Sequence, residues 1–202
     1  MKKIVFSAVQ IFSAQRIFWN RTRKDAIYLT FDDGPLPGKT EVILDLLDKA
    51  KAKATFFVIG ERAEKHPDLM KKIAGAGHSI GNHTYSHYRF GGDIAAFLRE
   101  LEKGEQIIRE TSGKSQKLIR IPYGIVHFGL FAALLKHGYR VAFWNKDTKD
   151  YKLESPNDLS RYMNPEELQN GDVVLMHDFP EVTPEILDSI LNRYENNSFK
   201  AL

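Results

Sequence analysis

Cysteine is absent from the 202-residue sequence, and its absence removes two kinds of structure. Without cysteine there can be no disulfide framework, and a metal ion cannot be held by thiolate ligands. Any metal site must therefore be built from histidine and carboxylate side chains. The absence of cysteine alone does not assign a cellular compartment.

The excess of positive over negative charge is also small, since the formal net charge at pH 7 is only +3. Lysine and arginine are mixed with acidic residues along most of the chain, whereas a protein that binds nucleic acid normally carries a basic patch or stripe. We therefore expect no nucleic-acid partner. The basic cluster at residues 16–24 could contact an anionic surface, but we interpret it as a solvated segment.

Long apolar runs are missing as well. The apolar run at residues 4–14 is too short to span a bilayer. We interpret residues 1–25 as an N-terminal helix or targeting segment. A basic start followed by a short apolar run resembles a signal peptide, which would imply export. We favour an uncleaved amphipathic helix, and with it a cytoplasmic or membrane-surface location. The positions that fit one helical face are Ile4, Val5, Ala8, Ile11, Phe12 and Phe18.

The composition is that of one globular domain. Hydrophobic residues make up 43% and charged residues 27%, and no low-complexity tract is present. A chain of this length can bury one good core but is short for two domains. We expect a single domain over residues 26–202.

The segment Tyr28–Pro35 is the first along the chain whose side chains could take part in catalysis or metal binding. Its β-branched and aromatic residues predict a strand that Gly34 and Pro35 end, so that Asp32 and Asp33 lie at the C-terminal end of the strand. Neighbouring side chains on an extended segment point to opposite sides, which indicates different tasks for the two carboxylates. The alternative is a simple strand-closing turn.

The segment Gly81–His87 holds a second candidate, because His83 and His87 stand four residues apart. On a helical turn this spacing places both imidazoles on one face. One nearby carboxylate would then complete a three-ligand metal site with an open position for water. Taken alone, such a histidine pair is also common on protein surfaces.

Strands and helices alternate along the rest of the chain, which predicts a parallel sheet of about seven strands. Closure into a barrel is the natural solution, although the pattern alone does not separate a barrel from an open doubly wound sheet. The loop at residues 145–170 should contain one helix near residues 156–163. Strands are expected at 26–31, 54–59, 78–82, 117–121, 139–144, 172–176 and 198–202, and helices after Thr40, over 61–76, 93–110 and 128–137, and from Thr183.

These segments resemble the polysaccharide deacetylases, which are carbohydrate esterase family 4 or NodB-homology domains. Thr30–Pro35 and His83–His87 match the first two family motifs, and Arg120–Gly124 and Leu175–His177 resemble the third and the last. Asp150–Tyr151 approximates the fourth, in which tryptophan normally follows the aspartate. The resemblance implies a distorted (β/α)7 barrel with parallel strands.

The resemblance also implies a metal-dependent hydrolase that removes N-acetyl or O-acetyl groups from a glycan such as chitooligosaccharide or peptidoglycan. By position, Asp33, His83 and His87 would bind a divalent metal, Asp32 would be the general base, and His177 would protonate the leaving amine. Zinc suits two imidazoles and one carboxylate best, while cobalt, nickel or manganese could occupy such a site.

Further roles follow from the remaining motifs. A salt bridge from Arg120 to Asp32 would keep that carboxylate ionised. Asp150 would orient Arg120 or His177, with Asp147 as its rival. The backbone N–H of Tyr123 would stabilise an oxyanion. Leu175, Trp144 and Tyr151 are assigned to substrate binding, and Tyr85, Tyr88 and Phe90 could also line a sugar groove.

Two alternatives to deacetylation stay open at this point. The same machinery could hydrolyse a formyl group or another small amide, or the chain could be a catalytically silent carbohydrate-binding protein. The intact set of aspartates and histidines counts against a silent protein. His66, His78 and His137 lie outside the motifs and are interpreted as structural or surface residues. The sequence assigns no oligomeric state.

Overall fold

A computed structural model describes residues 17–18, 25–114 and 116–202. The predicted N-terminal helix or targeting segment lies outside these residues, except at its end. There Ile17–Phe18 forms strand β1, so Phe18 does not belong to a helix. Strand β1 pairs with β6, and the sheet therefore includes residues on the N-terminal side of position 26.

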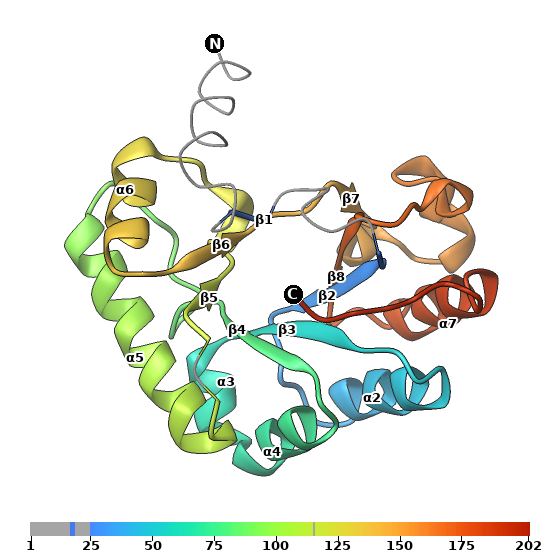
Figure 1. The fold of residues 1–202 in the computed structure, drawn as a ribbon, viewed down its shortest axis with the longest axis horizontal. Helices are drawn as coiled ribbons and strands as arrows, with labels where there is room; N and C mark the ends of the chain where they lie inside the picture. The colour runs from blue at the N-terminus through green and yellow to red at the C-terminus, as the bar shows by residue number, and fades with distance from the viewer. Residues whose placement is uncertain (1–16, 19–24, 115) are drawn as a thin grey trace.

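All pairings in the sheet are parallel, and the strands follow the order β1-β6-β5-β4-β3-β2-β8-β7. The sheet curls, and the helices lie outside it (Figure 1). This confirms the distorted barrel of parallel strands and excludes an open doubly wound sheet. The strands are β2 (Tyr28–Asp32), β3 (Ala54–Val58), β4 (Ser79–Asn82), β5 (Leu118–Ile119), β6 (Arg140–Ala142), β7 (Lys146–Asp147) and β8 (Val173–His177).

The described part of the chain has eight strands, where about seven were predicted, and one of the predicted strands is wrong. The short strand β7 was not predicted because lysine and aspartate carry no strand signal. Residues 198–202 make only a bridge between Ile27 and Phe199. They cross the end of the sheet where β3 and β4 begin: the Leu202 N–H donates to Thr55 Oγ1, and Ser79 Oγ donates to the Leu202 carbonyl. The opposite end of the sheet is left for the site.

The helices follow the predictions with one correction. The expected helix over 61–76 is two helices, because Pro67 has no N–H to donate and its ring clashes with the preceding turn. His66 ends the first helix, and Pro67 then begins the second. The helices are α2 (Lys39–Lys49), α3 (Gly60–Lys65), α4 (Pro67–Gly75), α5 (Ile94–Ser112), α6 (Phe128–Lys136) and α7 (Thr183–Arg193).

The polar loop between β6 and β8 contains β7 and three short 3₁₀ turns. The helix expected near 156–163 is the 3₁₀ turn Pro156–Arg161, and the others are Asp150–Lys152 and Pro165–Glu167. Together they bring Asp150 to the end of β8. No helix among the described residues has the length and apolar character needed to cross a membrane.

Strand β2 separates two environments. Leu29 and Phe31 face outward and join the large core beneath the helices, where the Phe31 and Phe56 rings stack at 5.1 Å. Thr30 and Asp32 face inward and bond the fully buried Arg120. The two-residue period of the strand thus sends alternate side chains to the core and to the site.

Candidate active site

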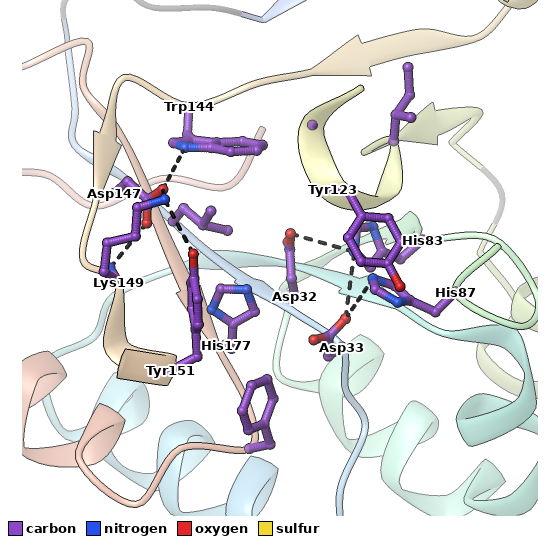
Figure 2. A pocket seen from close by; sticks show the side chains of 14 residues that line it. Asp32, Asp33, His83, His87, Tyr123, Trp144, Asp147, Lys149, Tyr151 and His177 are labelled. Atoms are coloured by element: carbon purple, nitrogen blue, oxygen red, sulfur yellow. Dashed lines mark hydrogen bonds and ion pairs between the residues drawn. The ribbon is translucent and has the colours of Figure 1, made fainter. Parts of the chain in front are cut away.

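An open pocket of about 300 Å³ lies where the strands end. Figure 2 shows Asp33 with His83 and His87 on one side of it, and His177 with Tyr151 on the other. The convergence follows from the parallel sheet, because all C-terminal strand ends meet at one edge. The lining residues are Asp32, Asp33, His83, His87, Ile121, Tyr123, Gly124, Trp144, Asp147, Lys149, Tyr151, Leu175, His177 and Phe179.

The two adjacent aspartates take different directions, as the strand geometry predicted. Asp32 ends β2 with its side chain facing Arg120. Asp33 has a φ of 72°, in the left-handed region that a residue with a side chain seldom adopts. Such a conformation costs about 1–3 kcal/mol and persists only where surrounding contacts hold it. The turn brings the Asp33 carboxylate to the two histidines.

Asp33, His83 and His87 form a compact group in which one ligand atom from each residue lies within 4.8 Å of the others. Asp33 Oδ1 is 3.6 Å from His83 Nε2 and 3.4 Å from His87 Nε2. This oxygen is buried and has no hydrogen-bond partner among the described residues. An orphaned carboxylate oxygen facing two imidazole nitrogens fits a cation.

The histidine pair does not lie on a helical turn as predicted. Residues 83–90 follow β4 as an irregular loop, in which Thr84 and His87 have φ values of 65° and 56°. The two positive φ values fold the loop back, and the imidazole rings come to 5.0 Å. The spacing therefore predicted the proximity correctly but for the wrong reason.

The tautomer of His83 is fixed by its surroundings. Its Nδ1 lies 2.8 Å from the Arg120 carbonyl oxygen, which can only accept, so Nδ1 carries the proton. Nε2 is then left unprotonated toward Asp33. Burial lowers the pKa of His83 to about 3, despite the nearby Asp33 charge. A neutral imidazole held through its other nitrogen is the form that binds metals.

Arg120 is completely buried and holds the inner face of the site together. Its Nη1 donates to Asp32 Oδ1 at 2.8 Å and to Thr30 Oγ1 at 2.7 Å, and its Nη2 donates to the Phe143 carbonyl. The predicted salt bridge to Asp32 is thereby confirmed. Burial raises the pKa of Asp32 above its ordinary value, and the Arg120 charge opposes that increase.

His177 faces the pocket from the end of β8 and is the register partner of Asp32 on the neighbouring strand. Asp150 Oδ1 accepts a hydrogen bond of 2.7 Å from His177 Nδ1. Burial alone would lower the pKa of His177, but the hydrogen bond and charge of Asp150 outweigh it, and the pKa rises to about 9. The sequence offered Arg120 and His177 as alternative partners of Asp150, and the residue that Asp150 bonds is His177.

Asp147, the rival of Asp150, serves another group. Its carboxylate accepts a hydrogen bond of 3.2 Å from Trp144 Nε1 and forms an ion pair of 2.5 Å with Lys149. It thus fixes the wall of the pocket that carries Trp144 and Tyr151.

The aromatic residues divide into two groups. Tyr123, Trp144 and Tyr151 line the pocket together with Leu175. Tyr85, Tyr88 and Phe90 do not line this pocket: Tyr85 bonds Glu64, and the other two pack near Phe97.

Sequence reasoning missed three residues near the site. Phe179 lines the pocket with its ring centroid 5.5 Å from that of His177, and Lys149 lines it beside Tyr151, to whose hydroxyl it donates at 3.3 Å. Asp178 is buried and bonded to Thr40, and burial raises its pKa to about 7. Its position directly after His177 was the one signal that could have marked it.

Comparison with known sequences gives a family for this arrangement. Residues 20–142 match the family profile described as polysaccharide deacetylase, which is more than half of the chain. The chain belongs to the polysaccharide deacetylase family. Family membership and the Asp33–His83–His87 group together indicate a divalent-metal site.

Two curated relatives illustrate the similarity. A peptidoglycan-N-acetylglucosamine deacetylase of Bacillus cereus is 37% identical over 158 residues, which cover 78% of this chain and 57% of the relative. The peptidoglycan-N-acetylmuramic acid deacetylase PdaC of Bacillus subtilis is 32% identical over 86% of this chain and 37% of its own length. The chain thus spans between about a third and three fifths of these relatives.

Solved structures agree with the fold. A peptidoglycan N-acetylglucosamine deacetylase in complex with an N-hydroxybenzamide has a TM-score of 0.87 at 31% identity, and the match covers 96% of this chain and 94% of that chain. A family 4 carbohydrate esterase from Streptomyces lividans in complex with acetate has a TM-score of 0.77 at 30% identity, with 86% and 91% covered. A pseudoenzyme from Bacillus anthracis, at 24% identity and a TM-score of 0.78, shows the same fold.

Proposed function

We propose that this protein is a metal-dependent deacetylase that hydrolyses the N-acetyl amides of a glycan, with peptidoglycan as the substrate class. The observation that carries the proposal is the convergence of three arrangements on one pocket. These are the Asp33–His83–His87 group, the Asp32–Arg120 pair and the His177–Asp150 pair. The catalytic unit comprises residues 26–202 together with β1.

Asp33, His83 and His87 would hold the metal, and zinc suits their two imidazoles and one carboxylate best. When bound there, a divalent cation supplies Lewis acidity, which lowers the pKa of water and polarises an acyl carbonyl. The open side of the group faces the pocket, so an acetyl group can approach it.

Asp32 is the proposed general base. Arg120 occupies its Oδ1 at 2.8 Å, while Oδ2 lies 3.7 Å from His83 Nε2, on the side of the metal group. Oδ2 is therefore the oxygen that can accept a proton from an attacking water. The Arg120 charge favours the ionised carboxylate that this role requires, against the effect of burial.

His177 is the proposed general acid. Its Nδ1 is held by Asp150, so its Nε2 is the nitrogen free to protonate the leaving amine. With a pKa of about 9, the imidazolium is the main form near neutral pH. An amine leaves as a neutral molecule only if it gains a proton, and His177 supplies it from the strand beside Asp32.

The remaining pocket residues bind the sugar. The backbone N–H of Tyr123 is proposed to donate to the acyl oxygen, and Leu175 to contact the acetyl methyl group. Trp144 and Tyr151 offer aromatic faces on which a pyranose ring can pack. Relatives named as deacetylases of N-acetylglucosamine and of N-acetylmuramic acid in peptidoglycan support this substrate class.

The test is a panel of acyl substrates after metal removal and reconstitution with zinc or cobalt. Acetate release from peptidoglycan or N-acetylglucosamine oligomers supports the proposal. Formate release without acetate release would show a deformylase on the same scaffold. Binding of the glycans without release of either acid would show a silent carbohydrate-binding protein.

A further inference from the structure

The start of helix α3 touches both chain segments that carry the proposed metal ligands. One segment is the turn after β2, with Asp33, and the other is the loop after β4, with His83 and His87. We infer that Arg62 and the first turn of α3 fix these two segments against each other, so that Arg62 is a positioning residue for the metal site. This inference rests on the proposed function.

The histidine loop is held by backbone donors of α3. The Gly60 N–H donates to the Thr84 carbonyl at 3.0 Å, and the Glu61 N–H donates to the Tyr85 carbonyl at 2.9 Å. The first N–H groups of a helix have no partner within the helix, so they are available for this purpose. Thr84 and Tyr85 lie between the two histidines, and the loop is thus anchored at its centre.

The aspartate turn is held by the same short segment. The Ile59 N–H donates to the Gly34 carbonyl at 2.9 Å, and Arg62 Nη1 donates to the Asp33 carbonyl. Asp33 has the left-handed φ of 72°, which its own chain does not favour. A conformation of this kind persists where neighbouring groups restrain it, and Arg62 provides that restraint from a side chain.

Close packing leaves little freedom at this junction. A Cβ atom added to Gly60 would lie 2.9 Å from Tyr85 Cδ2, 3.0 Å from Tyr85 Cα and 3.2 Å from Gly104 Cα. Helix α3 is thus wedged between the histidine loop and α5. From this closely packed helix, Arg62 reaches the Asp33 carbonyl.

Loss of the guanidinium would remove the side-chain restraint on Asp33 and leave the Ile59–Gly34 hydrogen bond as the contact of this segment with the turn, while the histidine loop stayed anchored. The distances from Asp33 Oδ1 to the two imidazole nitrogens would then no longer be fixed. Residues that orient metal ligands from behind are typically worth about 10–100-fold in metal affinity. Arg62→Met should lose that factor, whereas Arg62→Lys, which keeps one cationic donor, should retain part of it.

The experiment measures cobalt binding to the metal-free protein, by competition with a chelator and by the visible spectrum of the bound ion. Lys65→Met is the matched control, since Lys65 lies on the same helix and is exposed. We expect about 10–100-fold weaker binding and an altered spectrum for Arg62→Met, intermediate values for Arg62→Lys, and wild-type values for the control. The unfolding temperature of the metal-free proteins should differ little.

Wild-type cobalt affinity and spectrum in Arg62→Met would overturn the positioning role, and so would a loss of stability without a loss of affinity. If Arg62→Met does not fold, Arg62→Lys decides in its place: a weaker affinity or shifted spectrum supports the inference, and unchanged values overturn it. The proposed metal site itself would be contradicted if the wild-type protein bound no cobalt, or if His83→Ala bound cobalt as tightly as the wild type.

Discussion

Replacing Asp150 by asparagine removes one charge from a carboxylate that has no exposed surface. Oδ1 accepts from His177 Nδ1 and from the Tyr151 N–H, while Oδ2 accepts from the His177 N–H and from Thr183 Oγ1. Asparagine keeps only one acceptor oxygen. With the amide nitrogen in place of Oδ1, it faces His177 as a donor and favours the neutral imidazole.

Two opposing causes set the pKa of His177. Burial lowers its pKa, and the Asp150 hydrogen bond and charge raise it to a net value of about 9. Without the Asp150 charge the burial effect remains, so the pKa must fall. A charged partner at hydrogen-bond distance typically shifts a pKa by about 1–3 units. Since His177 acts as an acid, its active form is lost at a lower pH in the variant.

The assay is the pH dependence of kcat/KM for acetate release. Asp150→Asn should move the alkaline limb to lower pH by about 1–3 units. Asp147→Asn is the matched control, because Asp147 pairs with Lys149 and Trp144 and should leave that limb in place. An alkaline limb that moves with Asp147 and ignores Asp150 would refute the assigned pair.

The free energy of unfolding of the metal-free protein should also depend on pH through the ionisation of His177. The pKa of His177 in the folded protein, about 9, exceeds its ordinary value of 6.5. The resulting stability is fully present below about pH 6.5 and is lost as the pH rises through about 9. At 1.36 kcal/mol per pKa unit it amounts to about 3 kcal/mol. Denaturant unfolding at both ends of this range should show the loss in the wild type and a smaller one in Asp150→Asn.

Three further outcomes are expected from the site. Chelation should abolish hydrolysis, and a His83→Ala, His87→Ala double variant should no longer bind metal; stoichiometric metal retained by that variant would contradict the ligand assignment. Asp32→Asn should lower turnover by about 10²-fold or more with metal content unchanged, whereas Asp33→Asn should weaken metal binding; the opposite pattern would mean that the two roles are exchanged. Arg120→Met should lower the free energy of unfolding by about 3–5 kcal/mol, because the buried Asp32 charge loses its partner; a change below about 1 kcal/mol in denaturant unfolding would show that the pair does not stabilise the fold.

The sequence predicted most elements because their signals are local. Apolar periodicity marked α5 and α7, and β-branched and aromatic runs marked β2 and β3. The prediction failed where tertiary contacts decide the structure. Strand β7 consists of two polar residues that pair with the neighbouring strand β8. Residues 198–202 cross the end of the sheet, where Leu202 bonds Thr55, and do not form a strand.

The site was predictable where parallel strand ends converge and less so in the loops. The alternation on β2 predicted that Asp32 and Asp33 diverge, but no local pattern reveals the left-handed φ of Asp33 or its contact with Arg62 of α3. The His83–His87 pair came together on an irregular loop rather than on a helix. Arg62 and Phe179 were missed, since their roles depend on positions in space and not on spacing in the chain.

The most direct test of the account is a titration of the metal-free protein with zinc, in which bound metal and acetate release from N-acetylated peptidoglycan fragments are measured on the same samples. We expect acetate release to increase in proportion to bound zinc and to stop increasing at one ion per chain. Acetate release that is equally fast in the metal-free protein would contradict it, and so would a fully loaded protein that releases no acetate from any fragment.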